Sequence, residues 1–561
     1  MAIDVGGLVS IVVFYLIILV IGVWAGRKTG FRTKNMRTDD VMLANRSIGL
    51  FVGTFTMTAT WVGGGYINGT TEVVALSGGL VWCQAPVGYA LSLVFGGLFF
   101  AEKLRSSGFT TMLDPFHWKY GDLMNCLLYI PALSGDVFWS AAILTALGAS
   151  LRVILDLNLE LAIIVSAAIA CLYTLIGGLY SVAYTDVIQL ICMFVGLWLC
   201  VPFVLTHESV SPVTANSTQL WLGTLTPDHA ANYIDLGLLL IFGGIPWQVY
   251  WQRALSARTA GIARGLSFLG AVGCLVMAVP SVIMGAVAAT TDWNSTGYGR
   301  VQISDYDRPL VLPLVMKHLC PPAVSYIGLG AISAAVMSST DSSVLSSSSM
   351  FARNVVGVIY SRTHGRKISE SAQIWIMRVA QIVITAMACV MAISVESIYG
   401  LWILCSDFVY VILFPQLLCV MYLKGTNSYG SFLAFFSGLI LRLLGGDNSL
   451  HIPAVIHYPW YDATTNTQLF PFRTLSMLVS LFTLIIFSYL AEYLFTRCHA
   501  PLTWDLYRCF QPPSPLAKSN TKLVSLTCDE GTGSYVRHRL TVHGEHNLGY
   551  LSDDRITSTK L

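Results

Sequence analysis

The sequence predicts an all-α polytopic membrane protein with about thirteen transmembrane helices. Of its 561 residues, 55% are hydrophobic and 11% are charged, whereas an average soluble protein has about 25% charged residues. Apolar runs of about 20 residues, long enough to cross a bilayer, recur along the chain. Lipid is therefore the expected solvent for most of it.

The apolar runs divide the chain into regular segments. The first run, from Leu8 to Ala25, follows no basic leader, so we expect a retained helix and not a signal peptide. The expected spans lie near residues 7–26, 49–70, 79–101, 124–150, 160–180, 186–206, 233–252, 264–289, 322–352, 371–394, 400–423, 429–445 and 472–496.

Basic loops set the expected orientation. The loop after the first span carries six basic residues, and short basic loops stay cytoplasmic, so the N-terminus is expected outside and the C-terminus inside. Alternation then places on the inside Lys103, Arg105, Arg253, Arg258, Arg264, Arg353 and Arg362. The glycosylation acceptors Asn216 and Asn294 fall in loops expected outside. This pattern predicts a multi-pass glycoprotein of the plasma membrane.

Two spans are interrupted by glycines beside a tryptophan, in Thr60–Tyr66 and in Gly243–Trp247. A helix broken at membrane depth frees peptide groups that hydrocarbon cannot satisfy, so such a break persists only where it lines a polar cavity or binds an ion. Each broken span opens a set of five spans, and the two sets run in opposite directions. Inverted repeats of this kind place a binding site between their lead helices.

The repeat divides the chain into six segments. They are an N-terminal extra helix with a basic cytoplasmic loop (1–48), a first five-helix repeat (49–206), an extracellular loop (207–232), a second five-helix repeat (233–423), two additional helices (424–496) and a cytosolic tail (497–561). The tail is polar, rich in serine and threonine, and without apolar periodicity, so we expect it to be disordered.

The densest polar cluster at membrane depth runs from Ser338 to Ser349 and contains one charge, Asp341. Sodium is a hard cation that prefers oxygen ligands, and hydroxyls with freed carbonyls supply oxygens without accumulating negative charge. Serines in membrane helices also bond back to carbonyls one turn earlier and permit close helix packing. We favour ion binding for Ser338 and Ser339, because a broken helix can complete their ligand shell.

Aromatic residues form a second group near the breaks. If they converge, their ring faces would attract a cation that cannot donate hydrogen bonds, such as a quaternary ammonium. Most tryptophans of membrane proteins instead belong to interfacial belts or pack against lipid. The position of two of them at the breaks favours the binding role for this set, which is Trp61, Tyr89, Trp139, Trp247 and Trp402.

Three further acids lie in or beside the expected spans. Asp186 stands at an expected cytoplasmic helix start, where it either favours the helix N-terminus or joins Asp341 and Ser342 in a second cation site. Asp136 and Asp407 are intramembrane acids with no partner evident from the sequence.

Motifs of catalysis are missing from the sequence. Its histidines lack metal-ligand spacing, and it has neither a nucleophile elbow nor a glycine-rich loop that would hold ATP. The net charge of +2 argues against nucleic acid as a partner. We therefore expect no enzyme and no cofactor, but a secondary active transporter driven by an ion gradient.

Four motifs closely resemble the sodium/solute symporter family, in particular its members that carry choline with sodium and chloride. They are Thr56–Thr70, Gly177–Asp186, Gly243–Gln248 and Ala334–Ser339. The resemblance runs from the first span to about residue 496. It implies a LeuT-like five-plus-five inverted-repeat core with extra helices before and after it.

The resemblance also implies site residues. Sodium would be bound by backbone oxygens of Ala59, Val62 and Ala335 and by the hydroxyls of Ser338 and Ser339. The second cation site would use Asp186, Asp341 and Ser342. Choline would lie in the aromatic set described above, and the location would be presynaptic membrane and synaptic vesicles.

The expected function is sodium-coupled, chloride-dependent import of choline across the plasma membrane by alternating access. One alternative is a sodium symporter for another organic solute, which would gather polar or basic groups at the breaks. Another is a transport-inactive sensor or channel on the same fold.

Overall fold

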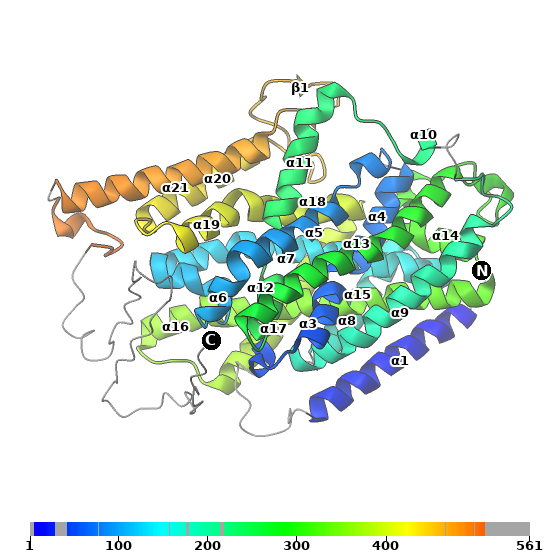
Figure 1. Ribbon diagram of the computed structural model, residues 1–561, viewed down its shortest axis with the longest axis horizontal. Coiled ribbons are helices and arrows are strands. Elements are labelled where there is room, and N and C mark those ends of the chain that lie inside the picture. Colours follow the sequence, from blue (N-terminus) through cyan, green and yellow to red (C-terminus); the bar gives the residue numbers. More distant parts are fainter. Residues whose placement is uncertain are drawn as a thin grey trace, which may run out of the picture. The chain divides into compact units, whose positions relative to one another are not determined.

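The computed structural model describes residues 5–28, 42–76, 78–155, 157–175, 179–213, 218–395, 397–465, 467–498 and 500–510. The part described is almost entirely helical (Figure 1), as expected. The described residues up to Ala491 form one compact unit, and those from Glu492 to Phe510 belong to a second. The expected tail lies outside the described residues from 511 onward, as does the segment 29–41 of the basic loop.

Within the described residues, nine helices are long and apolar enough to cross a membrane. Three shorter apolar helices, Gly6–Gly22, Leu159–Leu172 and Ser428–Leu444, match the first, fifth and twelfth expected spans. The second expected span consists of two half-helices, each too short to cross alone. The polytopic fold is confirmed, whereas the count of thirteen and the orientation stay predictions.

The N-terminal part begins with α1 and continues into the first expected repeat. Its helices are α1 (Val5–Lys28), α3 (Leu50–Trp61), α4 (Gly64–Leu76), α5 (Ala85–Phe95), α6 (Glu102–Ser106), α7 (Asp114–Leu155), α8 (Leu159–Thr174) and α9 (Leu179–Leu205). The short α10 (Thr218–Trp221) follows in the expected extracellular loop. Figure 1 shows α1 along one edge of the bundle, where it packs on α9 and α15.

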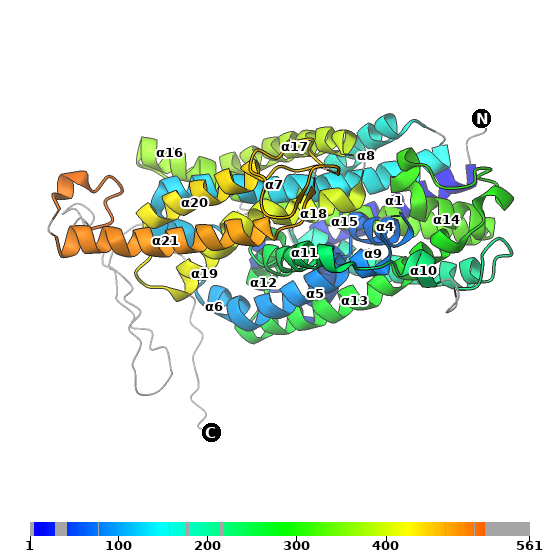
Figure 2. The same ribbon diagram turned by 90° about the horizontal axis from the view of Figure 1, so that it is seen from above.

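The second expected repeat and the additional helices follow. They are α11 (Ala230–Gly243), α12 (Gln248–Ser256), α13 (Ala260–Thr290), α14 (Val311–Leu319), α15 (Pro322–Met350), α16 (Gly357–His364), α17 (Glu370–Ser394), α18 (Ile398–Phe408), α19 (Phe414–Tyr422), α20 (Ser428–Leu444) and α21 (Phe472–Thr496). Figure 2 shows α20 and α21 side by side, and the Ser480 hydroxyl of α21 donates to the Ala434 carbonyl of α20 at 3.1 Å.

Three membrane helices contain a turn of π-helix. These turns are Gly96–Ala101 after α5, Phe351–Val356 between α15 and α16, and Val409–Leu413 between α18 and α19. A π-turn inserts one extra residue into a helix and is frequent at functional sites. The turn Val409–Leu413 lies inside the expected span 400–423, whereas the other two lie at the ends of the expected spans 79–101 and 322–352.

The only strands of the described residues are β1 (Tyr461–Asp462) and β2 (Thr467–Gln468), paired antiparallel before α21. The side chain of Asp462 accepts hydrogen bonds from the hydroxyls of Thr464 and Thr465. These bonds stabilise the charged carboxylate and lower the pKa of Asp462 to about 2. The hairpin is therefore a local turn of an exposed loop, and the fold class remains all-α.

Three loops expected on the cytoplasmic side meet at one end of the bundle. The Arg46 guanidinium donates to the carbonyls of Gly108 and Phe109 at 2.8 and 3.0 Å. The Arg105 side chain donates to the Ala257 carbonyl at 2.7 Å. The loops that alternation assigns to one side of the membrane thus do lie together.

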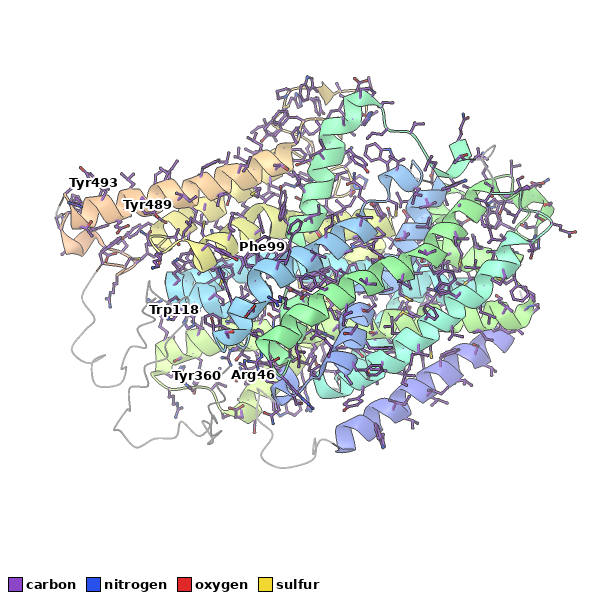
Figure 3. All side chains as sticks on the ribbon, viewed as in Figure 1. Arg46, Phe99, Trp118, Tyr360, Tyr489 and Tyr493 are labelled. Carbon is purple, nitrogen blue, oxygen red and sulfur yellow. The ribbon has the colours of Figure 1, made fainter. Side chains whose placement is uncertain are left out.

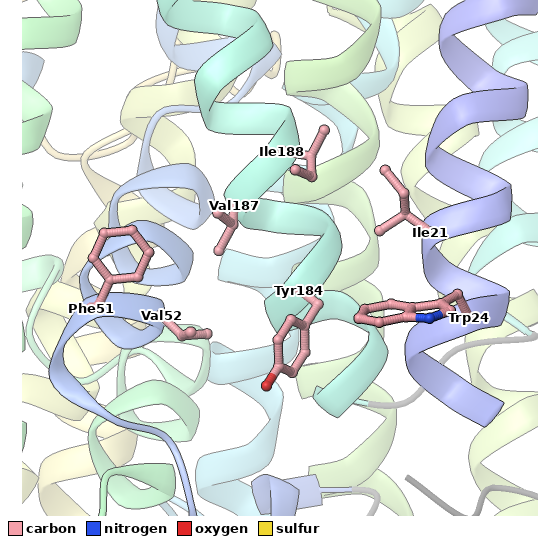
Figure 4. A pocket seen from close by; sticks show the side chains of 7 residues that line it. All are labelled: Ile21, Trp24, Phe51, Val52, Tyr184, Val187 and Ile188. Carbon is pink, nitrogen blue, oxygen red and sulfur yellow. The ribbon is translucent and has the colours of Figure 1, made fainter. Parts of the chain in front are cut away.

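The outer surface of the helices is rich in apolar and aromatic side chains, as expected for lipid contact. Phe99, Trp118 and Tyr489 (Figure 3) are 50%, 73% and 47% exposed. Between α1, α3 and α9 lies a shallow pocket (Figure 4). Its lining is entirely apolar in surface and comprises Ile21, Trp24, Phe51, Val52, Tyr184, Val187 and Ile188, none of them an expected site residue.

Candidate functional site

The first helix break lies where the sequence predicts it. Helix α3 ends at Trp61, Val62 leaves the helical conformation with φ −88° and ψ 69°, and α4 begins at Gly64. A Cβ on Gly63 would lie 2.0 Å from the Ser339 hydroxyl. The chain therefore requires glycine here, because α15 approaches the break so closely.

The expected sodium ligands gather at this break. The Ser338 and Ser339 hydroxyls both lie 3.4 Å from the Ala59 carbonyl oxygen. These separations are long for a hydroxyl hydrogen bond, whose usual length is about 2.7–2.8 Å. They fit two oxygens that share one cation at roughly 2.3–2.6 Å each, the range for a hard ion of calcium's size.

The other two expected ligands are buried on the same two elements. Val62 is the residue at which α3 ends, and Ala335 precedes Ser338 by one helical turn of α15. The Thr60 carbonyl, which the sequence analysis does not include, also lies 3.4 Å from the Ser339 hydroxyl. The break thus presents carbonyl oxygens to a helix that presents hydroxyls.

The second break is also confirmed. Helix α11 ends at Gly243 and α12 begins at Gln248, so Gly244 to Trp247 form the interruption. Trp247 has extended backbone angles, φ −122° and ψ 127°, which turn its side chain away from the course of the helix. Trp61 and Trp247 therefore stand at the ends of two broken helices.

All five expected aromatic residues come together in one cluster. The ring centroids of Trp61 lie 4.8 Å from Tyr89 and 5.2 Å from Trp247. Trp139 lies 5.2 Å from Trp247 and 6.0 Å from Trp402. Tyr89 lies 5.3 Å from Trp402. Each ring is at most 3% exposed, which excludes the lipid-belt alternative for this set.

Two hydrogen bonds fix the orientation of rings in this cluster, which we call the aromatic cluster. The Trp247 indole N–H donates to Asp136 Oδ1 at 2.8 Å. The Tyr89 hydroxyl pairs with the Ser406 hydroxyl at 2.7 Å. Asp136, which has no evident partner in the sequence, therefore has one in the structure.

The expectation that Asp186 stands at a helix start is wrong. Helix α9 begins at Leu179, so Asp186 lies about two turns inside it and is fully buried. Its carboxylate accepts from the Thr56 hydroxyl and from the Ser338 hydroxyl, the latter at 2.5 Å. Asp186 thus contacts one of the expected sodium ligands directly.

Arg253 corrects a second expectation. The sequence analysis places it in a cytoplasmic loop, but α12 continues to Ser256 and the Arg253 side chain is 1% exposed. Its guanidinium donates to the Ser342 hydroxyl and lies 3.7 Å from Asp186 Oδ2. Two residues of the expected second cation site, Asp186 and Ser342, therefore adjoin a cation that the protein itself supplies, and the third, Asp341, is also buried.

Asp407 belongs to a separate charged network. It accepts from Arg442 Nε at 2.7 Å and from Arg473 Nε at 3.3 Å. Asp447 accepts from Arg442 at 2.7 Å, and Asp235 of α11 lies 3.9 Å from Arg473. The network joins α11 and α18 to α20 and to the start of α21.

The glycosylation acceptors differ in what the structure describes. Asn294 is exposed in a short turn after α13, and Asn216 lies outside the described residues. A third sequon, Asn68-Gly69-Thr70, is buried inside α4.

Taken together, two broken helices, an oxygen cluster at one break and a buried aromatic cluster between them define a secondary active transporter of the inverted-repeat type. The model of the Sodium:solute symporter family matches residues 41–438. The chain belongs to the sodium:solute symporter family.

Curated relatives support this assignment. The chain is 55% identical over 509 residues to "High-affinity choline transporter 1" of Drosophila melanogaster, covering 90% of this chain and 82% of that protein. It is 51% identical over 522 residues to "High affinity choline transporter 1" of Homo sapiens, covering 90% and 89%. These relatives are transporters by name, in agreement with the expectation that the chain is not an enzyme.

A solved structure shows the fold. The chain is similar, with a TM-score of 0.68 and 15% identity, to a Na+-coupled sialic acid symporter in a substrate-bound, outward-open state. The match covers 86% of this chain and 97% of that chain. The LeuT-like fold of the sequence analysis is therefore confirmed.

Proposed function

We propose that the protein imports choline across the plasma membrane by sodium-coupled symport. The observation that carries this proposal is the convergence of five buried aromatic rings where the two broken helices meet. The names of relatives 51 to 55% identical to the chain support the same substrate. An anionic solute would require a basic side chain at its binding site. Among the described residues, no arginine or lysine side chain stacks on or hydrogen-bonds to a ring of this cluster.

The aromatic cluster suits a quaternary ammonium because such a cation cannot donate hydrogen bonds. It is instead attracted to the negative faces of aromatic rings when the cation lies within about 6 Å of the ring centroid. Trp61 and Trp247 now meet edge to face, with their ring centroids 5.2 Å apart. A guest must therefore separate these rings, which moves the helix ends that carry them and links binding to a change of conformation.

The hydroxyl of choline also has a candidate partner. The indole N–H of Trp61 is buried and has no hydrogen-bond partner among the described residues. Leaving a buried donor unpaired costs free energy. An alcohol oxygen in the cluster would satisfy it.

Sodium would bind to Ala59, Val62, Ala335, Ser338 and Ser339. An ion there joins α3 to α15 next to the residue, Trp61, that forms one wall of the aromatic cluster. Sodium therefore favours the conformation in which the rings are arranged for choline, and two ligands that prefer the same conformation are coupled.

Three finer points belong to the proposal. Chloride assists transport from a site that we do not assign. The location is presynaptic membrane and synaptic vesicles. The second cation site of Asp186, Asp341 and Ser342 would bind sodium only in a conformation in which Arg253 has moved away, because its guanidinium contacts Ser342 and pairs with Asp186.

Radiolabelled choline uptake tests the proposal in cells that express the chain. We expect uptake that requires sodium and falls when chloride is replaced by gluconate. Uptake of another solute in its place, or sodium currents without uptake of any solute, would support one of the alternatives. Cells that express the Trp247→Ala variant serve as the matched control, because their choline uptake measures the part that does not depend on the aromatic cluster.

A further inference from the structure

Asp136 is a buried acid directly beside the aromatic cluster. It is 0% exposed on α7, one helical turn before Trp139, so both residues share a helix face. Its Oδ1 atom accepts the indole N–H of Trp247 at 2.8 Å. Its second carboxylate oxygen, Oδ2, is buried and has no hydrogen-bond partner among the described residues.

Asp136 differs from three other buried acids, Asp186, Asp235 and Asp407, in its lack of a cationic partner. Asp186 lies 3.7 Å from Arg253, Asp235 lies 3.9 Å from Arg473, and Asp407 is bonded to Arg442. Among the described residues, Asp136 forms no ion pair. A charge at membrane depth is costly unless a cation accompanies it, and acids in this position usually mark a substrate or ion path.

We infer that Asp136 is a positioning and specificity residue, whose carboxylate is the buried counter-charge of the transported ammonium and acts through the indole of Trp247. This inference rests on the proposed function. It assigns to Asp136 the preference for a charged guest over an uncharged guest of the same shape.

The geometry gives the physical reason. A hydrogen bond from an indole N–H to an anion is charge-assisted, and hydrogen-bonded groups polarise one another. The ring of Trp247 thereby gains electron density on the face that attracts a cation. The negative charge of Asp136 also attracts the guest through space, and this attraction is strong because the surroundings are buried and weakly polarisable.

A purely structural role would have a different consequence. If Asp136 only held the Trp247 ring in place, its replacement would weaken the binding of charged and uncharged guests to the same degree. A counter-charge acts on the charged guest alone. The selectivity between choline and 3,3-dimethyl-1-butanol, its uncharged carbon isostere, therefore separates the two roles.

The experiment measures, for surface-expressed full-length protein, the half-saturating choline concentration and the concentration of 3,3-dimethyl-1-butanol that halves choline uptake. The selectivity is the concentration of 3,3-dimethyl-1-butanol divided by the half-saturating concentration of choline. We expect D136N to lower this ratio about tenfold, since one buried unit charge is removed, and D136E to retain most of it. The matched control is D122N on the same helix as Asp136, which removes a half-exposed carboxylate that pairs with His117 of α7 and with Arg362 of α16.

A second variant covers the case in which D136N does not reach the surface. W247F keeps an aromatic ring but has no N–H, so we expect it to lower the ratio several-fold in the same direction. An unchanged ratio in surface-expressed D136N, or in W247F, overturns the inference. Absence of sodium-dependent choline uptake by the unmodified chain would refute the proposed function as well, whereas normal uptake with an unchanged ratio in the variants refutes this inference alone.

Discussion

The hydroxyl of Ser339 lies against both Ala59 and Thr60 at the first break, 3.4 Å from each carbonyl oxygen. It differs in this respect from other serines of the same helix. The Ser348 hydroxyl bonds back to the Leu345 carbonyl of its own helix at 3.0 Å. The structure thus distinguishes a serine whose hydroxyl faces another helix from one whose hydroxyl bonds to a carbonyl of its own helix. This distinction cannot be read from the run of serines in the sequence.

Ser339→Ala removes one expected oxygen ligand of sodium. We expect the sodium concentration for half-maximal uptake to rise roughly tenfold, as for the loss of about 1.4 kcal/mol of binding free energy. The measurement is choline uptake against external sodium. Ser348→Ala is the control, since its hydroxyl contacts only its own helix. An unchanged sodium dependence in Ser339→Ala would remove this residue from the site.

Trp247→Ala removes a ring that contacts Trp61 and Trp139 and the N–H that binds Asp136. We expect choline uptake to fall at least about tenfold with surface expression retained, because one cation–π contact in a desolvated site contributes about 2 kcal/mol. Trp118→Ala, at a 73% exposed position, provides the comparison. Normal uptake by well-expressed Trp247→Ala would argue against the aromatic cluster as the binding site.

Trp61, Val62 and Trp247 could be predicted from the sequence because they stand at the helix breaks, and a break leaves a local signal of glycine beside tryptophan. The other members of the two clusters lie inside helices, and the family resemblance implied them.

The partners of buried charges could not be predicted from the sequence. Arg253 directly follows an apolar span, so the sequence predicts that it lies in a loop. Its partner Asp186 is 67 residues away in the sequence, and only tertiary packing brings the two together. Asp136 and Trp247 are separated by 111 residues, and no local pattern connects them.

The breaks themselves depend on close packing between elements. Gly63 faces α15 so closely that an added Cβ would lie 2.0 Å from Ser339 Oγ and 2.6 Å from Ser339 Cβ. Contacts this short force two elements apart, because a buried interface is packed at the density of an organic crystal and has no slack.

Gly63→Ala should therefore separate the first break from α15 and raise the sodium requirement for uptake more than Ser339→Ala does. The measurement is again uptake against sodium, with surface protein quantified by biotinylation. Gly261→Ala, in the first turn of α13 with nothing within 4 Å of the added Cβ, is the matched control and should leave uptake unchanged. Equal behaviour of the two variants would contradict the close approach.

Arg253 links α12 to α9 and α15 through Asp186 and Ser342. Arg253→Gln leaves the Asp186 carboxylate buried without its cation, and breaking a buried pair in this way costs about 3–5 kcal/mol. We expect lower surface expression and a lower unfolding temperature of the purified protein. The double variant Arg253→Gln with Asp186→Asn should recover much of that temperature, and no recovery would show that the pair is not what stabilises this junction.

The ends of helices were harder to predict than their existence. Helix α9 begins at Leu179 and not near residue 186, since Leu179, Val182 and Ala183 pack in the core. The glycines before it lie outside the described residues at 176–178. The π-turns at Gly96, Phe351 and Val409 leave no trace in hydropathy, because one inserted residue changes the facing of side chains but not their composition.

Orientation in the membrane is a property of the entire chain, and packing alone does not determine it. The basic loops of Arg46, Arg105 and Arg258 meet at one end of the bundle, and charge then decides which side of the membrane that end occupies. Asn294, expected on the opposite side, is exposed and hence accessible to glycosylation.

Asn294→Gln tests this orientation. If the N-terminus is outside, Asn294 enters the lumen during synthesis and receives a glycan, so treatment of the unmodified protein with an N-glycosidase should increase its mobility on a gel. Asn294→Gln should lose all or part of that shift, the remainder reporting on Asn216. Asn68→Gln is the control, because that sequon is buried within α4 and should carry no glycan in either orientation. A full shift in Asn294→Gln would show that this site is unused. Were the unmodified protein to show no shift while a cysteine introduced beside Arg46 reacted with an impermeant reagent from outside, the assigned orientation would be inverted, and with it the direction in which the sodium gradient drives choline.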